Sequence, residues 1–124
     1  MSEITPIPFN DNYRRIATEE AWASPELLQM YADLYNSGKI DDPGFDSLWG
    51  FYGTSNANRP ATVRRRLADL DEERLADMDA AGIDFAVLAL TSPGVQVFDR
   101  DTAISVAKDT NDIVKAAVDR HPDR

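Results

Sequence analysis

Residues 15–22 read Arg-Ile-Ala-Thr-Glu-Glu-Ala-Trp, a β-capable stretch that begins apolar and then carries two adjacent carboxylates, Glu19 and Glu20. A helix-start signal follows at once, because Ser24 can cap a helix and Pro25 suits its first turn. A strand that leads through acidic side chains into a helix is typical of an α/β unit. Such units collect their chemistry at the carboxyl ends of the strands.

The two adjacent glutamates are expected to differ in orientation. Side chains alternate across a strand, so Glu19 shares one face with Ala21 and Glu20 shares the other with Trp22. One glutamate therefore faces inward and the other does not. Most such pairs are merely solvated, so the pair alone is weak support for a site. Glu19 is nevertheless the candidate metal ligand, as a single hard oxygen donor at the end of the first strand.

A second strand is expected at residues 85–90, Phe-Ala-Val-Leu-Ala-Leu, which form a continuous apolar run between Gly82 and Pro93. Six residues between two breakers are too few for a helix. The run therefore predicts a strand that is buried on both faces, as in a parallel sheet. The turn Thr91-Ser92-Pro93-Gly94 follows it.

The helical spacing of apolar residues predicts helices over residues 25–37, 61–81 and about 101–120. A glycine follows each of the first two and is expected to end it. The apolar positions of the second helix slip near Asp71, so a bend or two abutting helices is expected there.

Residues 39–60 are expected to form a long loop that is rich in glycine. The loop contains a cluster of four aromatic residues and one leucine: Phe45, Leu48, Trp49, Phe51 and Tyr52. Connections of this length are uncommon unless they bind or cover something. From the residues alone, two interpretations stay open. The loop is pinned over a core by its aromatic side chains, or Tyr52 and Arg59 reach from it to a ligand.

The element order strand, helix, long loop, helix, strand, helix predicts an α/β fold with right-handed crossovers. Although 124 residues suit one domain, only two strands are found, and two parallel strands leave both sheet edges open. The sequence also ends where a third strand is expected to begin. We therefore interpret residues 1–124 as the opening portion of a larger barrel or sheet domain, with residues 1–12 as a mobile leader.

The composition excludes several classes of partner. A formal charge of −9 argues against nucleic acid, which needs clustered lysine and arginine. The one basic cluster, Arg64-Arg65-Arg66, lies among acidic residues and is interpreted as a solvated, salt-bridged helix face. Nothing approaches the ~20 consecutive apolar residues of a membrane span, so no membrane partner is expected. The absence of cysteine fits a cytoplasmic protein.

Other catalytic patterns are missing from the sequence. The only histidine, His121, is expected to be a surface group at the end of the last helix rather than a metal ligand. Thr91 and Ser92 lack a histidine partner, so no nucleophilic triad can form. The glycines match neither a phosphate-binding loop nor a dinucleotide fingerprint.

Four blocks of sequence carry a family resemblance: residues 15–22, Ser-Leu-Trp-Gly-Phe-Tyr (47–52), Ala-Asp-Met-Asp-Ala (76–80) and Leu-Ala-Leu-Thr-Ser-Pro-Gly-Val-Gln (88–96). Together, and in this order, they resemble the N-terminal part of the 5-carboxyvanillate decarboxylases. That family lies in the decarboxylase branch of the amidohydrolase superfamily. The resemblance runs through nearly the whole chain but covers only the first part of a family member.

The resemblance implies a (β/α)8 TIM barrel, incomplete in this chain, with one divalent metal, Mn²⁺ or Zn²⁺, at its carboxyl face. Glu19 matches the first-strand metal ligand. Ala21 stands where many relatives have a histidine ligand, a departure that the 5-carboxyvanillate type shares. Tyr52 and Arg59 match loop positions that contact the substrate carboxylates, which an arginine can hold bidentately.

By the same resemblance, Thr91 and Ser92 would line the pocket, while the proton donor and the remaining metal ligands lie beyond residue 124. The implied reaction is non-oxidative loss of carbon dioxide from a hydroxylated aromatic acid such as 5-carboxyvanillate, in lignin-related catabolism. The full-length enzyme is expected to be a homo-oligomer, and this chain alone, without a catalytic residue, to be inactive. Two alternatives stay open: a superfamily hydrolase or hydratase of a ring-cleavage product, and a non-catalytic truncated chain.

Overall fold

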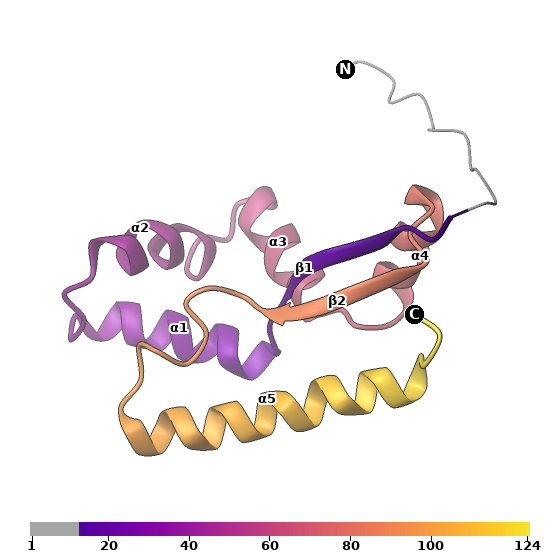
Figure 1. Cartoon of the computed structure of the whole chain (residues 1–124). Coiled ribbons are helices and arrows are strands. Elements are labelled where there is room, and N and C mark those ends of the chain that lie inside the picture. Colours follow the sequence, from indigo (N-terminus) through magenta and orange to yellow (C-terminus); the bar gives the residue numbers. More distant parts are fainter. Residues whose placement is uncertain (1–12) are drawn as a thin grey trace.

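The computed structural model describes residues 13–124, within which the chain forms two strands and five helices (Figure 1). In chain order they are β1 (Ile16–Trp22), α1 (Pro25–Ser37), α2 (Pro43–Tyr52), α3 (Asn58–Ala68), α4 (Glu72–Ala81), β2 (Phe85–Leu90) and α5 (Arg100–Arg120). The α/β class predicted from the sequence is confirmed. The expected leader, residues 1–12, lies outside the described residues. None of the described helices is long and apolar enough to cross a membrane.

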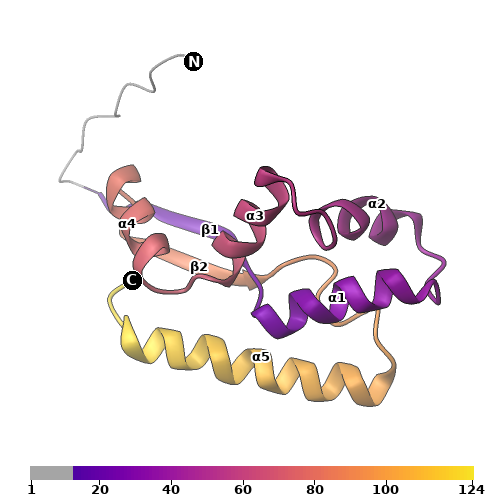
Figure 2. The same cartoon turned by 180° about the vertical axis from the view of Figure 1, so that it is seen from behind.

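β1 and β2 pair in parallel, and the four helices between them form the crossover (Figures 1 and 2). One face of this sheet packs against α5 and the α3–α4 connection through an apolar cluster: Trp22, Leu70, Leu88, Leu90, Val114 and Ala117. The predicted bounds of β2 are confirmed, but its predicted burial on both faces is wrong. Val87 is 53% exposed because the packed helices cover the face that bears Leu88 and Leu90. The carbonyl of Arg124 accepts from the N–H of Ala86 at 2.8 Å, which brings the last residue alongside β2.

Residues 39–60 are not the long loop that their glycines and polar residues led us to expect, because α2 fills the middle of this segment and α3 begins before its end. Asp42 caps α2: its carboxylate accepts from the N–H of Phe45 at 3.0 Å, and a proline follows in the first turn. Phe45 and Trp49 lie one turn apart and are 4% and 2% exposed. The aromatic side chains therefore pin the segment to the core, and they do so from a helix.

The other helices follow the sequence prediction closely. α1 has the predicted bounds: the Ser24 hydroxyl accepts from a first-turn N–H at 3.1 Å, and Gly38 ends the helix with a φ of 65°. The helix expected over 61–81 is two abutting helices, α3 and α4, and α3 begins earlier, at Asn58. α5 begins at Arg100 and ends as predicted.

α1 and α2 lie beyond the carboxyl ends of the two strands (Figure 1), where two aromatic donors tie them to the turn after β2. The Tyr31 hydroxyl donates to the carbonyl of Gly94 at 2.6 Å, and Trp49 Nε1 donates to the carbonyl of Ser92 at 3.1 Å. Burial raises the pKa of Tyr31 well above its usual range, so its hydroxyl remains a donor. These two bonds fix the first residues beyond β2.

Replacing Tyr31 with phenylalanine should lower the free energy of unfolding by about 1–2 kcal/mol, because the ring stays packed while the Gly94 carbonyl loses its donor. Urea denaturation measures the change. Tyr35→Phe, in the same helix, is the matched control, since the Tyr35 side chain is exposed and its hydroxyl has no partner within residues 13–124. That control should change stability by less than about 0.5 kcal/mol. Equal losses in both variants would contradict the prediction.

Candidate functional site

β1 carries a β-bulge at Glu19, which lies in the middle of the strand and not at its end as predicted. The register of β1 advances from Ala17 to Glu20 while that of β2 advances only from Ala86 to Leu88, so β1 holds one extra residue here. Glu19 has a φ of 59°, and it is the one non-glycine residue with a positive φ in the described chain. Such a conformation costs a non-glycine residue about 1–2 kcal/mol. Strain of this kind gathers at functional sites.

The two adjacent glutamates have different surroundings. Glu20 is half-buried, lines a cleft of about 430 Å³ between β1, α3 and α4, and is attracted by the charge of Arg74. Glu19 is exposed, and its carboxylate has no hydrogen-bond or ion-pair partner among residues 13–124. Neither carboxylate forms a hydrogen bond or ion pair among residues 13–124, and Glu19 is the more exposed of the two.

Tyr52 and Arg59 lie on either side of the connection between α2 and α3. Tyr52 is the half-buried last residue of α2, with its ring edge-on to that of Phe51 at 5.1 Å. Arg59 is exposed in the first turn of α3. Arg64 fixes this connection, because its Nη1 donates to the carbonyls of Tyr52 at 2.6 Å and Ser55 at 2.8 Å. The helix that bears Arg59 is thereby fastened to the backbone of Tyr52.

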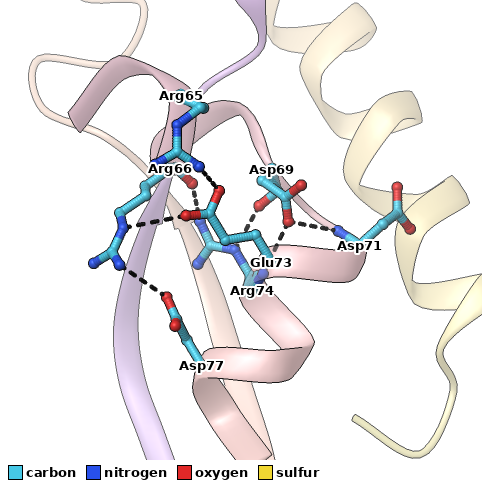
Figure 3. Close-up of polar contacts among 7 residues, drawn as sticks. All are labelled: Arg65, Arg66, Asp69, Asp71, Glu73, Arg74 and Asp77. Carbon is cyan, nitrogen blue, oxygen red and sulfur yellow. Dashed lines mark hydrogen bonds and ion pairs between the residues drawn. The ribbon is translucent and has the colours of Figure 1, made fainter. Parts of the chain in front are cut away.

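The basic cluster predicted to be a solvated helix face divides between two roles. Arg65 and Arg66 are exposed and form ion pairs with Glu73, as the sequence suggested, and Arg66 also pairs with Asp77 at 3.5 Å (Figure 3). Arg64 departs from that prediction, since its guanidinium binds backbone carbonyls between α2 and α3.

Thr91 and Ser92 lie where the two strands end. The N–H of Thr91 donates to the carbonyl of Trp22 at 2.8 Å, and the carbonyl of Ser92 accepts from Trp49. Thr91 is half-buried and Ser92 is exposed. The structure therefore brings the ends of β1 and β2 and the helix α2 to one edge of the sheet. Among the described residues, no hydrogen bond or ion pair joins Glu19 to this group.

His121 caps the end of α5, as predicted, but it has a partner that sequence reasoning missed. Its Nε2 lies 2.6 Å from Oδ1 of Asp71, which also accepts from Arg120 Nε at 3.0 Å. The Arg120 hydrogen bond, then that of His121, holds the pKa of Asp71 below its ordinary 3.8. Such a carboxylate adds stability above its ordinary pKa, and this stability is lost as the pH falls through the lowered value. The contact links α4 to α5 and gives His121 a structural role.

The described residues do not form a complete metal site. Within residues 13–124, no three histidine, cysteine, aspartate or glutamate side chains gather closely enough to hold an ion. The carboxylate of Glu19 has the donor chemistry that suits Mn²⁺, but it is a single oxygen donor group. The chain therefore fits a divalent metal as the source of one ligand.

Solved structures of decarboxylases are similar to this chain. A 5-carboxyvanillate decarboxylase from Novosphingobium aromaticivorans, complexed with manganese and 4-hydroxy-3-methoxy-5-nitrobenzoic acid, is 49% identical, with a TM-score of 0.85 over 91% of this chain. A 5-carboxyvanillate decarboxylase from Sphingomonas paucimobilis is 35% identical, with a TM-score of 0.72 over 90% of this chain. This chain covers 32% of each of those two proteins.

Among curated proteins, a γ-resorcylate decarboxylase from Rhizobium radiobacter is 35% identical over 111 residues, which are 89% of this chain and 28% of that protein. No protein-family model matches the sequence. The resemblance to 5-carboxyvanillate decarboxylases noted from the four sequence blocks is confirmed. The chain spans less than a third of the length of the relatives that it matches.

Replacing Glu19 with glycine should raise the free energy of unfolding by about 1 kcal/mol, because glycine adopts a positive φ without the penalty that a side chain incurs. Urea denaturation of the 124-residue chain measures this. Glu20→Gly is the matched control: its backbone is not left-handed, so glycine there should cost about 0.5–1 kcal/mol. A destabilised Glu19→Gly chain would show that the bulge is not strained at this residue.

Proposed function

We propose that this chain forms part of a divalent-metal-dependent, non-oxidative decarboxylase that acts on a hydroxylated aromatic carboxylic acid such as 5-carboxyvanillate. The proposal is carried by the 49% identity and the TM-score of 0.85, over 91% of the chain, to a manganese-bound 5-carboxyvanillate decarboxylase. For the whole protein we propose a (β/α)8 TIM barrel, of which the two parallel strands and their crossover are a part. The activity is assigned to that whole protein, because the chain covers only 32% of the solved enzyme.

Glu19 is the proposed metal ligand of this chain. Its exposed carboxylate lies on a bulge, at a φ of 59°, in the strand that leads to the carboxyl edge of the sheet. We propose manganese ahead of zinc, because related structures hold manganese. When bound, a divalent cation supplies positive charge that offsets the negative charge developing during the reaction.

Tyr52 and Arg59 are the proposed contacts for the substrate carboxylates. A guanidinium can hold a carboxylate with two parallel hydrogen bonds, and Arg59 is exposed at the start of α3. Arg64 supports the pair, because it lies on the same helix as Arg59 and binds the carbonyl of Tyr52 at 2.6 Å. Thr91 and Ser92, at the end of β2, are proposed to line the pocket.

The proton donor for the ring carbon and the further metal ligands are proposed to lie outside residues 13–124. With Glu19 as its one ligand, the 124-residue chain by itself is proposed to be inactive. The expected cytoplasmic location, a homo-oligomeric whole protein and a role in the catabolism of lignin-derived aromatic compounds belong to the same proposal.

A chimera tests this function. Residues 13–124 replace the matching segment of the Novosphingobium aromaticivorans decarboxylase, and Mn²⁺-dependent release of carbon dioxide from 5-carboxyvanillate is measured. We expect turnover by the chimera and none by the 124-residue chain alone. A folded, Mn²⁺-binding chimera that instead hydrolyses or hydrates a ring-cleavage product would favour the alternative enzyme class. Turnover by the isolated chain would contradict the proposed division of the site.

In the chimera, Glu19→Gln should weaken Mn²⁺ binding and lower kcat/KM by about a hundredfold or more. Loss of a residue that only hydrogen-bonds a metal ligand lowers metal affinity or activity by about 10–100-fold, and loss of a ligand itself should cost at least as much. Glu72→Gln, at an exposed glutamate in the first turn of α4, is the control and should leave Mn²⁺ affinity within about threefold of the parent, because small surface changes alter free energies little. Metal affinity is measured by titration, separately from turnover. An equal loss of Mn²⁺ affinity in the two variants would contradict the proposal that Glu19 is a metal ligand.

Arg59→Met in the same chimera should raise KM by about tenfold or more, because a hydrogen bond to a charged group contributes about 1.5–3 kcal/mol. Arg65→Met serves as the control, since Arg65 is also exposed but forms a surface ion pair with Glu73. Steady-state kinetics with 5-carboxyvanillate separates the effect on KM from that on kcat. An unchanged KM would exclude Arg59 from substrate binding.

A further inference from the structure

Arg74 directs its guanidinium to backbone carbonyls rather than to carboxylates. Its Nε donates to the carbonyl of Asp69 at 2.7 Å, and its Nη2 donates to that of Arg66 at 3.2 Å (Figure 3). The same Nη2 donates to the carbonyl of Ala21 in β1 at 3.0 Å. One side chain of α4 thereby joins the end of α3, the α3–α4 connection and β1. The side chain is half-buried, and burial lowers the pKa of Arg74 against the opposing charges of Glu20 and Asp69.

Other arginines pair with the carboxylates around Arg74. Glu73 pairs with Arg65 and Arg66, and Asp77 pairs with Arg66 (Figure 3). The arginines of these ion pairs are exposed to solvent, and such pairs are worth little to stability. Arg74 is the arginine of this cluster that bonds to β1. The role of Arg74 therefore differs from that of Arg65 and Arg66, because its guanidinium binds backbone carbonyls and theirs bind carboxylates.

The contact with Ala21 bears directly on the bulge. Ala21 follows Glu19 by two residues and pairs with Ala89, after the register shift. A one-residue slide of this strand would move every later side chain to the opposite face. The bond from Arg74 to the Ala21 carbonyl opposes that slide, and so does the bond from the Ala23 N–H to a carbonyl of α3 at 3.0 Å.

We propose that Arg74 is a positioning residue for Glu19. By holding the carbonyl of Ala21, it keeps β1 in the bulged register in which Glu19 is exposed with a positive φ and Glu20 faces α4. The charge of Arg74 acts in the same direction because it attracts Glu20. Any effect of Arg74 on metal binding and catalysis rests on the proposed role of Glu19 as a metal ligand. The effect of Arg74 on the backbone conformation of Glu19 does not depend on that role.

Solution NMR of the 124-residue chain tests this inference. A residue with positive φ gives a strong cross-peak between its own amide and α protons, because the two lie close together. In Arg74→Met we expect this cross-peak of Glu19 to weaken several-fold. Arg66→Met is the matched control, since it removes a neighbouring guanidinium whose ion pairs within residues 13–124 are with Glu73 and Asp77, and it should leave the cross-peak unchanged.

A second variant, Arg74→Lys, keeps the proposal testable if the Arg74→Met chain does not fold. Lysine keeps the positive charge, but a single ammonium cannot reproduce the fork that binds three carbonyls, so the Glu19 cross-peak should weaken here too. A folded Arg74 variant with the full cross-peak overturns the proposal. Equal weakening in Arg66→Met also overturns it, because the effect would then belong to the ionic cluster as a whole. The measurement needs neither metal nor substrate, so its failure is distinguishable from failure of the proposed function.

Discussion

One extra residue in β1 determines how this chain presents its acidic side chains. The bulge gives Glu19 a φ of 59°, leaves its carboxylate exposed and sets it apart from Glu20, which lies in the field of Arg74. A strained conformation persists only where its surroundings enforce it. Here the enforcement comes from regular pairing with β2 on both sides of the bulge and from bonds that α3 and α4 make to the end of β1. The candidate ligand is therefore positioned by backbone geometry, because its own carboxylate forms no hydrogen bond or ion pair within residues 13–124.

The other half of the candidate site is held by buried aromatic rings. The ring of Tyr31 lies 4.6 Å from that of Trp49, 6.0 Å from that of Phe45 and 5.9 Å from that of Phe98. Phe98 follows β2 in the chain, whereas the other three rings belong to α1 and α2, which precede it. The cluster therefore joins a segment after the second strand to two helices before it. α2, which ends at Tyr52, is thus packed and hydrogen-bonded against the end of β2. Binding residues on connections are effective when a rigid scaffold positions them, and these rings supply that scaffold.

Sequence reasoning succeeded where the signal is local and failed where it depends on tertiary contacts. The caps of α1 and the apolar run 85–90 specify their own elements, and both predictions hold to the residue. α2 had a local signal in Asp42 and the spacing of its aromatic residues, but the three glycines and the polar run of residues 39–60 outweighed it in our interpretation. The bulge at Glu19 arises from pairing with β2, and the contact between Asp71 and His121 joins residues 50 positions apart. Neither leaves a pattern in the sequence, and the candidate site was assembled chiefly from family resemblance for the same reason.

Under the proposed function, one cause explains both the uncovered face of the sheet, which bears Val87, and the presence of a single proposed metal ligand, Glu19. Val87 is 53% exposed on the face away from Leu88, although an apolar strand of a parallel sheet is normally covered on both faces. In a closed barrel that face is filled by side chains from the other strands, and the ends of those strands bring further polar groups to the carboxyl edge. The strands that would cover Val87 are therefore also the elements that would supply Glu19 with companion ligands. Completing the core and completing the metal site are then a single structural requirement.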